Sequence, residues 1–237
     1  ERNRPSSIKE AMLRLGKKSE ADDFWVLRDI DLDIEPGSFF GLIGHNGSGK
    51  TTLLRLMAGI HRPTSGTIVS EGRLSALLEL GSGFHPDLTG RENVFLNGAM
   101  LGLSRKHMAA SMDQIIEFSG IGEFIDEPVK IYSSGMYVRL GFAVAVNVDP
   151  ELLLVDEVIA VGDEEFQRRC MNHMNKLRAG GTTIVLVSHN TRLMADLCDR
   201  LGWLDHGRLM KVGDPDEVIE AYLAHVEKGD NTLTTHD

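Results

Sequence analysis

The sequence has 237 residues, of which 42% are hydrophobic and 25% charged, and its formal net charge is -10 at pH 7. This composition is ordinary for a soluble globular protein, and it excludes a disordered chain, which would hold too few apolar residues to form a core. The acidic balance repels phosphate backbones, and no dense run of Lys and Arg offers a local basic patch. We therefore expect no nucleic-acid partner.

The cysteines and the apolar segments indicate in which cellular compartment the protein works. Cys170 and Cys198 lie far apart and form no CxxC pair, which argues against a disulfide framework or a cysteine zinc site and favours a reducing cytoplasm. The most apolar stretch, residues 140–161, is interrupted by acidic and polar residues and cannot cross ~30 Å of hydrocarbon as a bare helix. The chain begins at Glu1 without Met or the apolar core of a signal peptide, which favours a trimmed chain over a secreted one. Any membrane role must come through a partner.

The first elements lead from an extension into a strand, a glycine loop and a helix. Residues 1–23 are polar with a weak helical stripe, and we predict an extension there. Residues 25–35 alternate in polarity, which predicts a strand, and the continuous apolar run 38–43 predicts a buried parallel strand. Helical spacing over 50–58 follows the glycine-rich loop 44–49.

The middle of the chain is predicted to be an inserted helical lobe. Apolar residues recur at helical spacing through about 89–148.

Three short segments favour antiparallel strands, which we expect to form a side sheet: residues 66–69, 202–204 and 208–212.

Two further apolar runs, 152–155 and 182–187, are predicted to be buried strands that end in polar residues. Open α/β sheets place their ligands at this end of their strands. We therefore expect an α/β domain over 24–226, followed by a short polar tail at 227–237.

A phosphate-binding loop is the strongest local signal. The segment GHNGSGKT fits G-x-x-x-x-G-K-[ST] at every fixed position and lies between a predicted strand and a predicted helix. Glycines allow backbone N–H groups to face the phosphates, a lysine adds a mobile charge, and a threonine hydroxyl can bind Mg²⁺. The residues expected to bind the nucleotide are Gly44, His45, Asn46, Gly47, Ser48, Gly49, Lys50, Thr51 and Thr52.

Polar residues at the ends of two later strands supply candidate catalytic groups. Asp156 and Glu157 close the apolar run 152–155, and adjacent residues of a strand point to different sides. Asp156 is expected to hold Mg²⁺, and Glu157 to polarise the water that attacks the γ-phosphate. His189 follows the strand 182–187 and could touch the γ-phosphate and this water. Without the phosphate loop, the acidic pair would read as an exposed turn and the histidine as an ordinary surface or core residue.

A second anion-binding segment leads to a family. Tyr132-Ser133-Ser134-Gly135-Met136 opens a predicted helix that starts at Met136, 20 residues before Asp156. In this place and order, the segment resembles the LSGGQ signature of ABC ATPases, a branch of the P-loop NTPases. The resemblance implies that Ser133, Ser134, Gly135 and Met136 act in trans on the ATP of a second copy, so that the catalytic unit is a homodimer.

Two segments narrow the resemblance to one branch. Residues 78–93 and the YSSGMYVRLGFAVA segment look like the exporters of bacterial surface polysaccharides such as O-antigen, capsule, teichoic acid and galactan. The branch implies an integral membrane permease, a lipid-linked polysaccharide handled indirectly, and a place at the cytoplasmic face of the plasma membrane. It also implies ATP and Mg²⁺ as cofactors. Some members carry a carbohydrate-binding domain after the ATPase, and here that domain is absent or was removed.

The chain departs from the family at two places, and a third family role, adenine stacking, has two candidate residues. The usual loop glutamine is missing, and Glu79 or Leu80 stands there; we prefer Glu79 as a polar contact in the loop that couples to the permease, with a structural loop residue as the alternative. Asp163 is the candidate for contacts across the dimer. Phe24 or Trp25 could stack on adenine, and either could equally be a core residue.

These residues suggest one mechanism, and two other classes of protein remain to be compared with it. We expect ATP to pull two chains together, hydrolysis to release them, and a membrane partner docked near residues 79–92 to move in response. A soluble ABC ATPase without a transporter is the alternative, but it usually joins two ATPase cores or inserts a long coiled coil, and neither is present. A GTPase is a third option, and the sequence argues against it because Asn175-Lys176 is not followed by the x-Asp pair that reads guanine.

Overall fold

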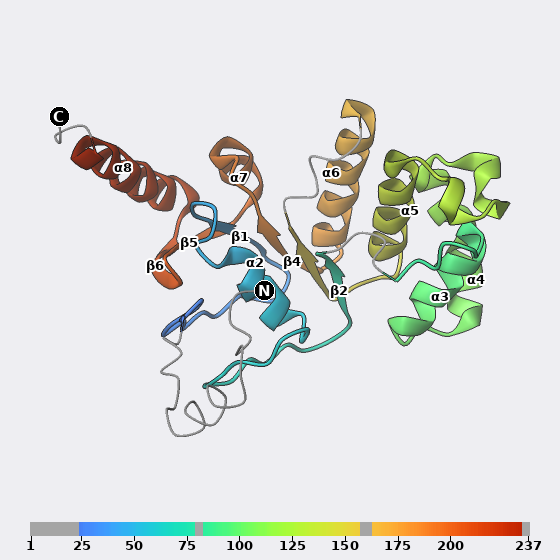
Figure 1. Cartoon of the computed structure of the whole chain (residues 1–237), viewed down its shortest axis with the longest axis horizontal. Helices are drawn as coiled ribbons and strands as arrows, with labels where there is room; N and C mark the ends of the chain where they lie inside the picture. The colour runs from blue at the N-terminus through green and yellow to red at the C-terminus, as the bar shows by residue number, and fades with distance from the viewer. Residues whose placement is uncertain (1–23, 79–82, 157–162, 234–237) are drawn as a thin grey trace, which may run out of the picture.

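A computed structural model describes residues 24–78, 83–156 and 163–233, with side chains to residue 227. It contains one six-stranded mixed sheet in the order β2-β3-β4-β1-β5-β6 (Figure 1). All neighbouring strands are parallel except β5 and β6, which are antiparallel. The strands are β1 (Phe39–Ile43), β2 (Leu74–Leu77), β3 (Leu152–Val155), β4 (Thr183–Val187), β5 (Arg200–Asp205) and β6 (Arg208–Gly213).

Helices cover both faces of the sheet and build a lobe beyond its β2 edge. In Figure 1, α6 and α7 lie over one face, α2 lies on the other, and α3, α4 and α5 gather at the end opposite α8. The helices are α2 (Lys50–Met57), α3 (Gly90–Met100), α4 (Arg105–Ser119), α5 (Ser134–Val146), α6 (Glu164–Ala179), α7 (Thr191–Leu197) and α8 (Pro215–Leu233), with 3-10 turns at Gly122–Asp126 and Val129–Ile131.

The alternation of side chains along the strands divides the core between the two faces. In β1, Phe39 and Ile43 pack in the cluster that holds the buried side of α6, while Phe40 and Leu42 pack in the cluster that holds Leu54 of α2. The period-two pattern of a strand requires this division. The lobe has a separate core in which α3, α4 and α5 meet, formed by Phe84, Val94, Met108, Met112, Ile115, Ile121, Ile125, Val129, Leu140, Ala143, Val144 and Val148.

The predicted α/β core, the antiparallel strand pair and the helical lobe are confirmed, but the separate side sheet is wrong. Strand β5 pairs with β1 on one edge and β6 on the other, so the antiparallel pair extends the main sheet. Residues 66–69 are exposed and form no strand. Residues 25–35 also form no strand, because Leu27 and other apolar residues of this segment pack beside α2 without joining the ladder.

Among the helices described, none combines the length and the apolarity needed to pass through a bilayer.

Candidate functional site

The phosphate loop has a backbone that only glycine fits at two positions. Gly44 and Gly49 have φ angles of 151° and 107°. A Cβ atom at Gly44 would lie 2.2 Å from the Leu204 carbonyl oxygen, and one at Gly49 would lie 2.7 Å from a Leu27 side-chain carbon. The loop is therefore held tightly between β5 and residues 26–28, so that its backbone N–H groups keep a fixed direction.

Lys50 and Ser48 place polar groups inside this loop. The ammonium of Lys50 is buried and donates to the carbonyls of Gly44, at 2.8 Å, and His45, at 2.9 Å. Ser48 is fully buried, and its hydroxyl has no hydrogen-bond partner in the described part of the chain. A buried hydroxyl without a partner is costly, and a bound phosphate oxygen would satisfy it. The glycine N-cap of α2 also has no side chain to cover the first N–H groups of the helix, so the loop fits a phosphate.

Thr51 and Asp156 meet at the start of α2 and the end of β3. The Thr51 hydroxyl donates to Oδ2 of Asp156 over 3.1 Å, and both residues are half-buried. A hydroxyl and a carboxylate are the hard oxygen ligands that Mg²⁺ prefers. The pair therefore fits the predicted metal site, although its role toward Mg²⁺ stays a prediction.

Of the two predicted catalytic residues, the structure describes His189 but not Glu157. Glu157 directly follows Asp156 but lies outside the described residues, as do Glu79 and Leu80. His189 is exposed and follows β4, which lies between β3 and β1 in the sheet. Because these three strands are parallel, their carboxyl ends bring His189, Asp156 and the phosphate loop to the same edge.

The signature segment begins α5. Ser133 is the N-cap residue, and its hydroxyl accepts from the backbone N–H of Met136 at 3.2 Å. The helix therefore starts at Ser134, earlier than the predicted Met136, because Ser133 satisfies one N–H of the first turn. Ser133 and Ser134 are both exposed, whereas Gly135 and Met136 are half-buried. Their action on a second chain stays a prediction.

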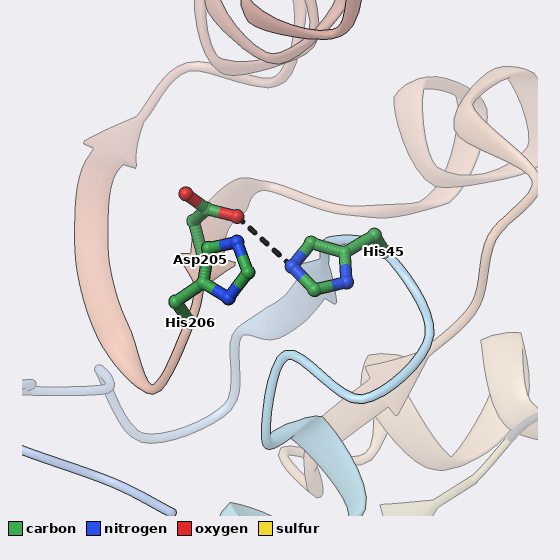
Figure 2. A group of neighbouring side chains, drawn as sticks. All are labelled: His45, Asp205 and His206. Atoms are coloured by element: carbon green, nitrogen blue, oxygen red, sulfur yellow. Dashed lines mark ion pairs between the residues drawn. The ribbon is translucent and has the colours of Figure 1, made fainter. Parts of the chain in front are cut away.

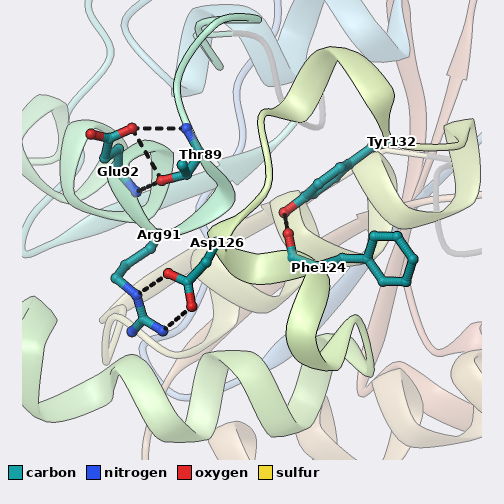
Figure 3. A network of polar contacts seen from close by, with 6 residues as sticks. All are labelled: Thr89, Arg91, Glu92, Phe124, Asp126 and Tyr132. Carbon is teal, nitrogen blue, oxygen red and sulfur yellow. Dashed lines mark hydrogen bonds and ion pairs between the residues drawn. The ribbon is translucent and has the colours of Figure 1, made fainter.

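Polar contacts join the signature segment to residues 85–92. The Tyr132 hydroxyl donates to the Phe124 carbonyl over 2.6 Å, and Arg91 forms two bonds, of 2.7 and 3.0 Å, to Asp126 (Figure 3). The backbone N–H of Lys130 also donates to the carbonyl of Pro86 at 2.9 Å. The two segments are thus parts of one hydrogen-bonded unit.

Asp163 has two partners in its own chain. Its carboxylate accepts from the Phe166 backbone N–H at 2.8 Å as the N-cap of α6, and from Arg139 at 2.5 Å. The Phe166 bond, with help from Arg139, holds the pKa of Asp163 below its ordinary value despite the opposing effect of desolvation. The predicted contact across a dimer is not tested by these bonds.

The two candidate aromatic residues are both exposed to solvent. Phe24 is 88% exposed and Trp25 is 47% exposed, so neither is a core residue. The guanidinium of Arg28 lies 5.2 Å from the ring centroid of Trp25, which leaves Phe24 the more accessible of the two. Adenine stacking stays a prediction for both.

Sequence reasoning missed two residues beside the phosphate loop. Asp205 and His206 form the end and turn of β5–β6, and Nε2 of His45 lies 3.0 Å from Oδ1 of Asp205. In the sequence this Asp-His-Gly segment lies between two predicted antiparallel strands, 202–204 and 208–212, and no motif marks it as a site. Its long-range pairing with His45 has no local signal in the sequence.

Comparison with known proteins decides the family. The ABC transporter family model matches residues 27–160. The chain belongs to the ABC transporter family. The ABC ATPase resemblance predicted from the signature segment is therefore confirmed.

Relatives of this ABC chain include ATP-binding proteins of polysaccharide export systems. It is 50% identical to the O-antigen export protein RfbB of Myxococcus xanthus, over 92% of this chain and 51% of that protein. It is 48% identical to RfbB of Klebsiella pneumoniae, over 84% of this chain and 81% of that protein. It is 43% identical to the teichoic acids export protein TagH of Listeria innocua, over 89% of this chain and 62% of that protein. The chain thus spans only about half of its Myxococcus relative.

Solved structures agree with the fold. An ATP-binding subunit of an ABC transporter matches with a TM-score of 0.75 and 23% identity, over 83% of this chain and 87% of the other. A dimeric ATP-binding cassette bound to ADP and Pi matches with a TM-score of 0.68 and 22% identity, over 80% and 90%. At these identities the likeness shows the fold alone.

Proposed function

We propose that this chain is the ATP-hydrolysing subunit of a transporter that exports a lipid-linked surface polysaccharide through a separate permease. The export relatives, at 43–50% identity in two groups of bacteria, support the substrate class. The phosphate loop with the Thr51–Asp156 contact supports ATP as the energy source. We place the chain at the cytoplasmic face of the membrane, held there by the permease.

Each residue of the nucleotide site has a proposed task. Lys50 and the N–H groups at the start of α2 bind the phosphates, and Thr51 and Asp156 hold Mg²⁺. Mg²⁺, when bound, neutralises charge that develops on the phosphate oxygens. Glu157 accepts the proton of the attacking water, and His189 contacts this water and the γ-phosphate.

The distance between the two anion-binding segments supports a dimer as the catalytic unit. Helix α5 ends beside β2, where the Ser75 hydroxyl donates to the Ala145 carbonyl over 2.9 Å. Strands β3 and β4 lie between β2 and β1, so this place is about 14 Å from the strand that carries the phosphate loop. Ser133 lies at the other end of α5, about 18 Å from Ala145 along the helix. Ser133 is therefore proposed to serve the nucleotide of a second copy.

The joined segments 85–92 and 124–132 offer a route from the nucleotide to the permease. We place the permease contact near residues 79–92, and this region is bonded to the signature segment through Arg91–Asp126 and Lys130–Pro86. The hydrogen-bonded segments 85–92 and 124–132 belong to the lobe, and residues of the second segment pack in its core. A shift of Ser133 toward bound ATP should therefore move the docking region with it.

Hydrolysis itself is tested with two variants. Glu157→Gln should bind ATP normally and lower the rate of phosphate release by about 10²- to 10⁴-fold, since it removes the proton acceptor. Lys50→Ala should lower phosphate release and should also weaken ATP binding, since it removes a charge that binds the phosphates. Unchanged phosphate release in Glu157→Gln would remove this residue from the proposed role.

The substrate class needs a cellular test. In a strain that lacks this gene, the wild-type gene should restore the surface polysaccharide, as seen by gel electrophoresis of cell-surface glycans, and Glu157→Gln should not. Normal glycan in the gene-less strain would contradict the export proposal while leaving the ATPase intact.

A further inference from the structure

A cluster of two histidines and one aspartate lies where the phosphate loop meets the β5–β6 turn. His45 comes from the loop after β1, and Asp205 and His206 come from the turn, so that His45 and Asp205 face one another (Figure 2). One possible ligand atom from each of the three residues lies within 4.8 Å of the others. The side chain of Asp205 is only 12% exposed and that of His45 is 39% exposed.

The hydrogen bonds of His45 leave Nε2 aimed at an acceptor. Nδ1 lies 2.7 Å from the carbonyl oxygen of Asn46, and a carbonyl can only accept, so Nδ1 carries the hydrogen. Nε2 lies 3.0 Å from Oδ1 of Asp205, at which distance a protonated imidazole forms an ion pair, and it is a buried atom without a hydrogen bond in the described chain. When the imidazole is neutral, its Nε2 lone pair and the carboxylate oxygen repel each other at this distance unless a cation lies between them.

This arrangement is typical of an imidazole that binds a metal. Histidine ligands commonly donate their second ring N–H to a backbone carbonyl, which fixes the ring and the tautomer. Zn²⁺ binds nitrogen and oxygen at about 2.0–2.2 Å in a tetrahedron, which separates two ligands by about 3.3 Å. The His45–Asp205 distance of 3.0 Å is close to this value, and His206 needs only a side-chain rotation because it is exposed on the turn.

We propose that His45, Asp205 and His206 form a binding site for a divalent transition metal of the Zn²⁺ class. Two imidazoles and one carboxylate select such an ion over Mg²⁺, which prefers oxygen ligands alone. The second oxygen of Asp205 lies 3.6 Å from Nε2 of His225, which can orient the carboxylate from α8.

The site would fasten the phosphate loop to the turn. Gly207 already donates its N–H to the carbonyl of Ser48 at 2.9 Å, and the His45 carbonyl accepts from Lys50. A metal bound by His45 and by the turn would add a further connection between the two segments and restrict the position of the loop.

The cysteines do not compete for the ion. Burial raises the pKa of both Cys170 and Cys198 to about 12, so both thiols stay protonated at neutral pH. Thiolates, not thiols, bind metals. Zinc binding by this chain should therefore depend on nitrogen and oxygen ligands.

The test is a calorimetric titration of Zn²⁺ into the metal-free full chain, prepared without a polyhistidine tag and without nucleotide. One Zn²⁺ per chain is expected. Asp205→Asn and His206→Asn should each weaken binding by at least ~10-fold. Asparagine is chosen at His206 because φ is 42° there, a conformation that asparagine tolerates.

Two control variants separate this site from others. His61→Asn removes an exposed histidine elsewhere and should bind Zn²⁺ like the wild type, as should Asp156→Asn, which alters the proposed Mg²⁺ site. X-ray absorption at the zinc edge should show nitrogen and oxygen ligands without sulfur. The absence of a saturable site, wild-type affinity for Zn²⁺ in Asp205→Asn and His206→Asn, or sulfur among the ligands would overturn the proposal.

Discussion

At the scale of single residues, Asp156 is the described residue with the most direct proposed chemical role, which is to hold Mg²⁺. Replacing it by Asn removes the charge but keeps the shape, so the Mg²⁺ concentration for half-maximal hydrolysis should rise by about 10- to 100-fold. ATP binding without Mg²⁺ should stay unchanged, which a fluorescent nucleotide would measure.

Glu151→Gln is the matched control for this variant. It removes an exposed charge just before the same strand, far from the phosphate loop. If Asp156→Asn and Glu151→Gln showed the same Mg²⁺ dependence, Asp156 would not hold the ion.

The partly buried His173 should make the stability of the fold depend on pH. Burial lowers its pKa below the ordinary 6.5, and its ring lies 5.1 Å from that of Phe118, with Nε2 3.1 Å from the Val146 carbonyl. The unfolded chain then binds more protons than the folded chain, so this contribution to stability is complete above pH 6.5 and is lost as pH falls through the folded pKa.

His173→Gln, which keeps an N–H donor but does not titrate, should lose less stability than the wild type between about pH 7.5 and about pH 5.5. Urea unfolding at the two pH values measures the difference. Parallel losses in the two proteins would show that His173 does not cause the pH dependence.

At the scale of elements, the start of α3 has a complete capping box. Thr89 accepts from the N–H of Glu92 at 3.1 Å, and the Glu92 carboxylate accepts from the N–H of Thr89 at 2.8 Å. Thr89→Ala should lower the free energy of unfolding by about 1 kcal/mol, whereas Thr89→Ser, which keeps the hydroxyl, should change it little. Denaturant titration would compare them, and equal stability of the two variants would argue against the cap.

The same scale explains which elements could be predicted from the sequence. The loop 44–49 and helix α2 were predictable because motif and context are contiguous, and α4 of the lobe shows apolar residues at helical spacing. Strand β2 was not predicted, since four residues of mixed polarity give little signal. Residues 25–35 alternate like a strand but form none, since apolar alternation reports burial and not hydrogen bonding.

The residues of the site also divide into those that local motifs predict and those that only the structure brings together. Lys50, Thr51 and Asp156 follow from motifs at the ends of predicted strands. The pairing of His45 with Asp205 depends on the β1–β5 register, which no local pattern determines. Contacts between distant segments therefore had to come from the structure.

At the scale of the whole molecule, the account depends on two chains completing each other's nucleotide sites. Ser133 is the residue that reports this, because it is exposed, caps α5 and lies far from its own phosphate loop. Asp and Asn both cap helices well, but only Asp adds a negative charge that would repel a γ-phosphate. Ser133→Asp and Ser133→Asn thus form a matched pair that preserves the fold.

The most direct measurement is analytical ultracentrifugation with Mg-ATP of chains that carry Glu157→Gln to block hydrolysis. The account predicts dimers for Glu157→Gln alone and with Ser133→Asn, and monomers that still bind ATP with Ser133→Asp. Dimers of equal stability in all three proteins would contradict it.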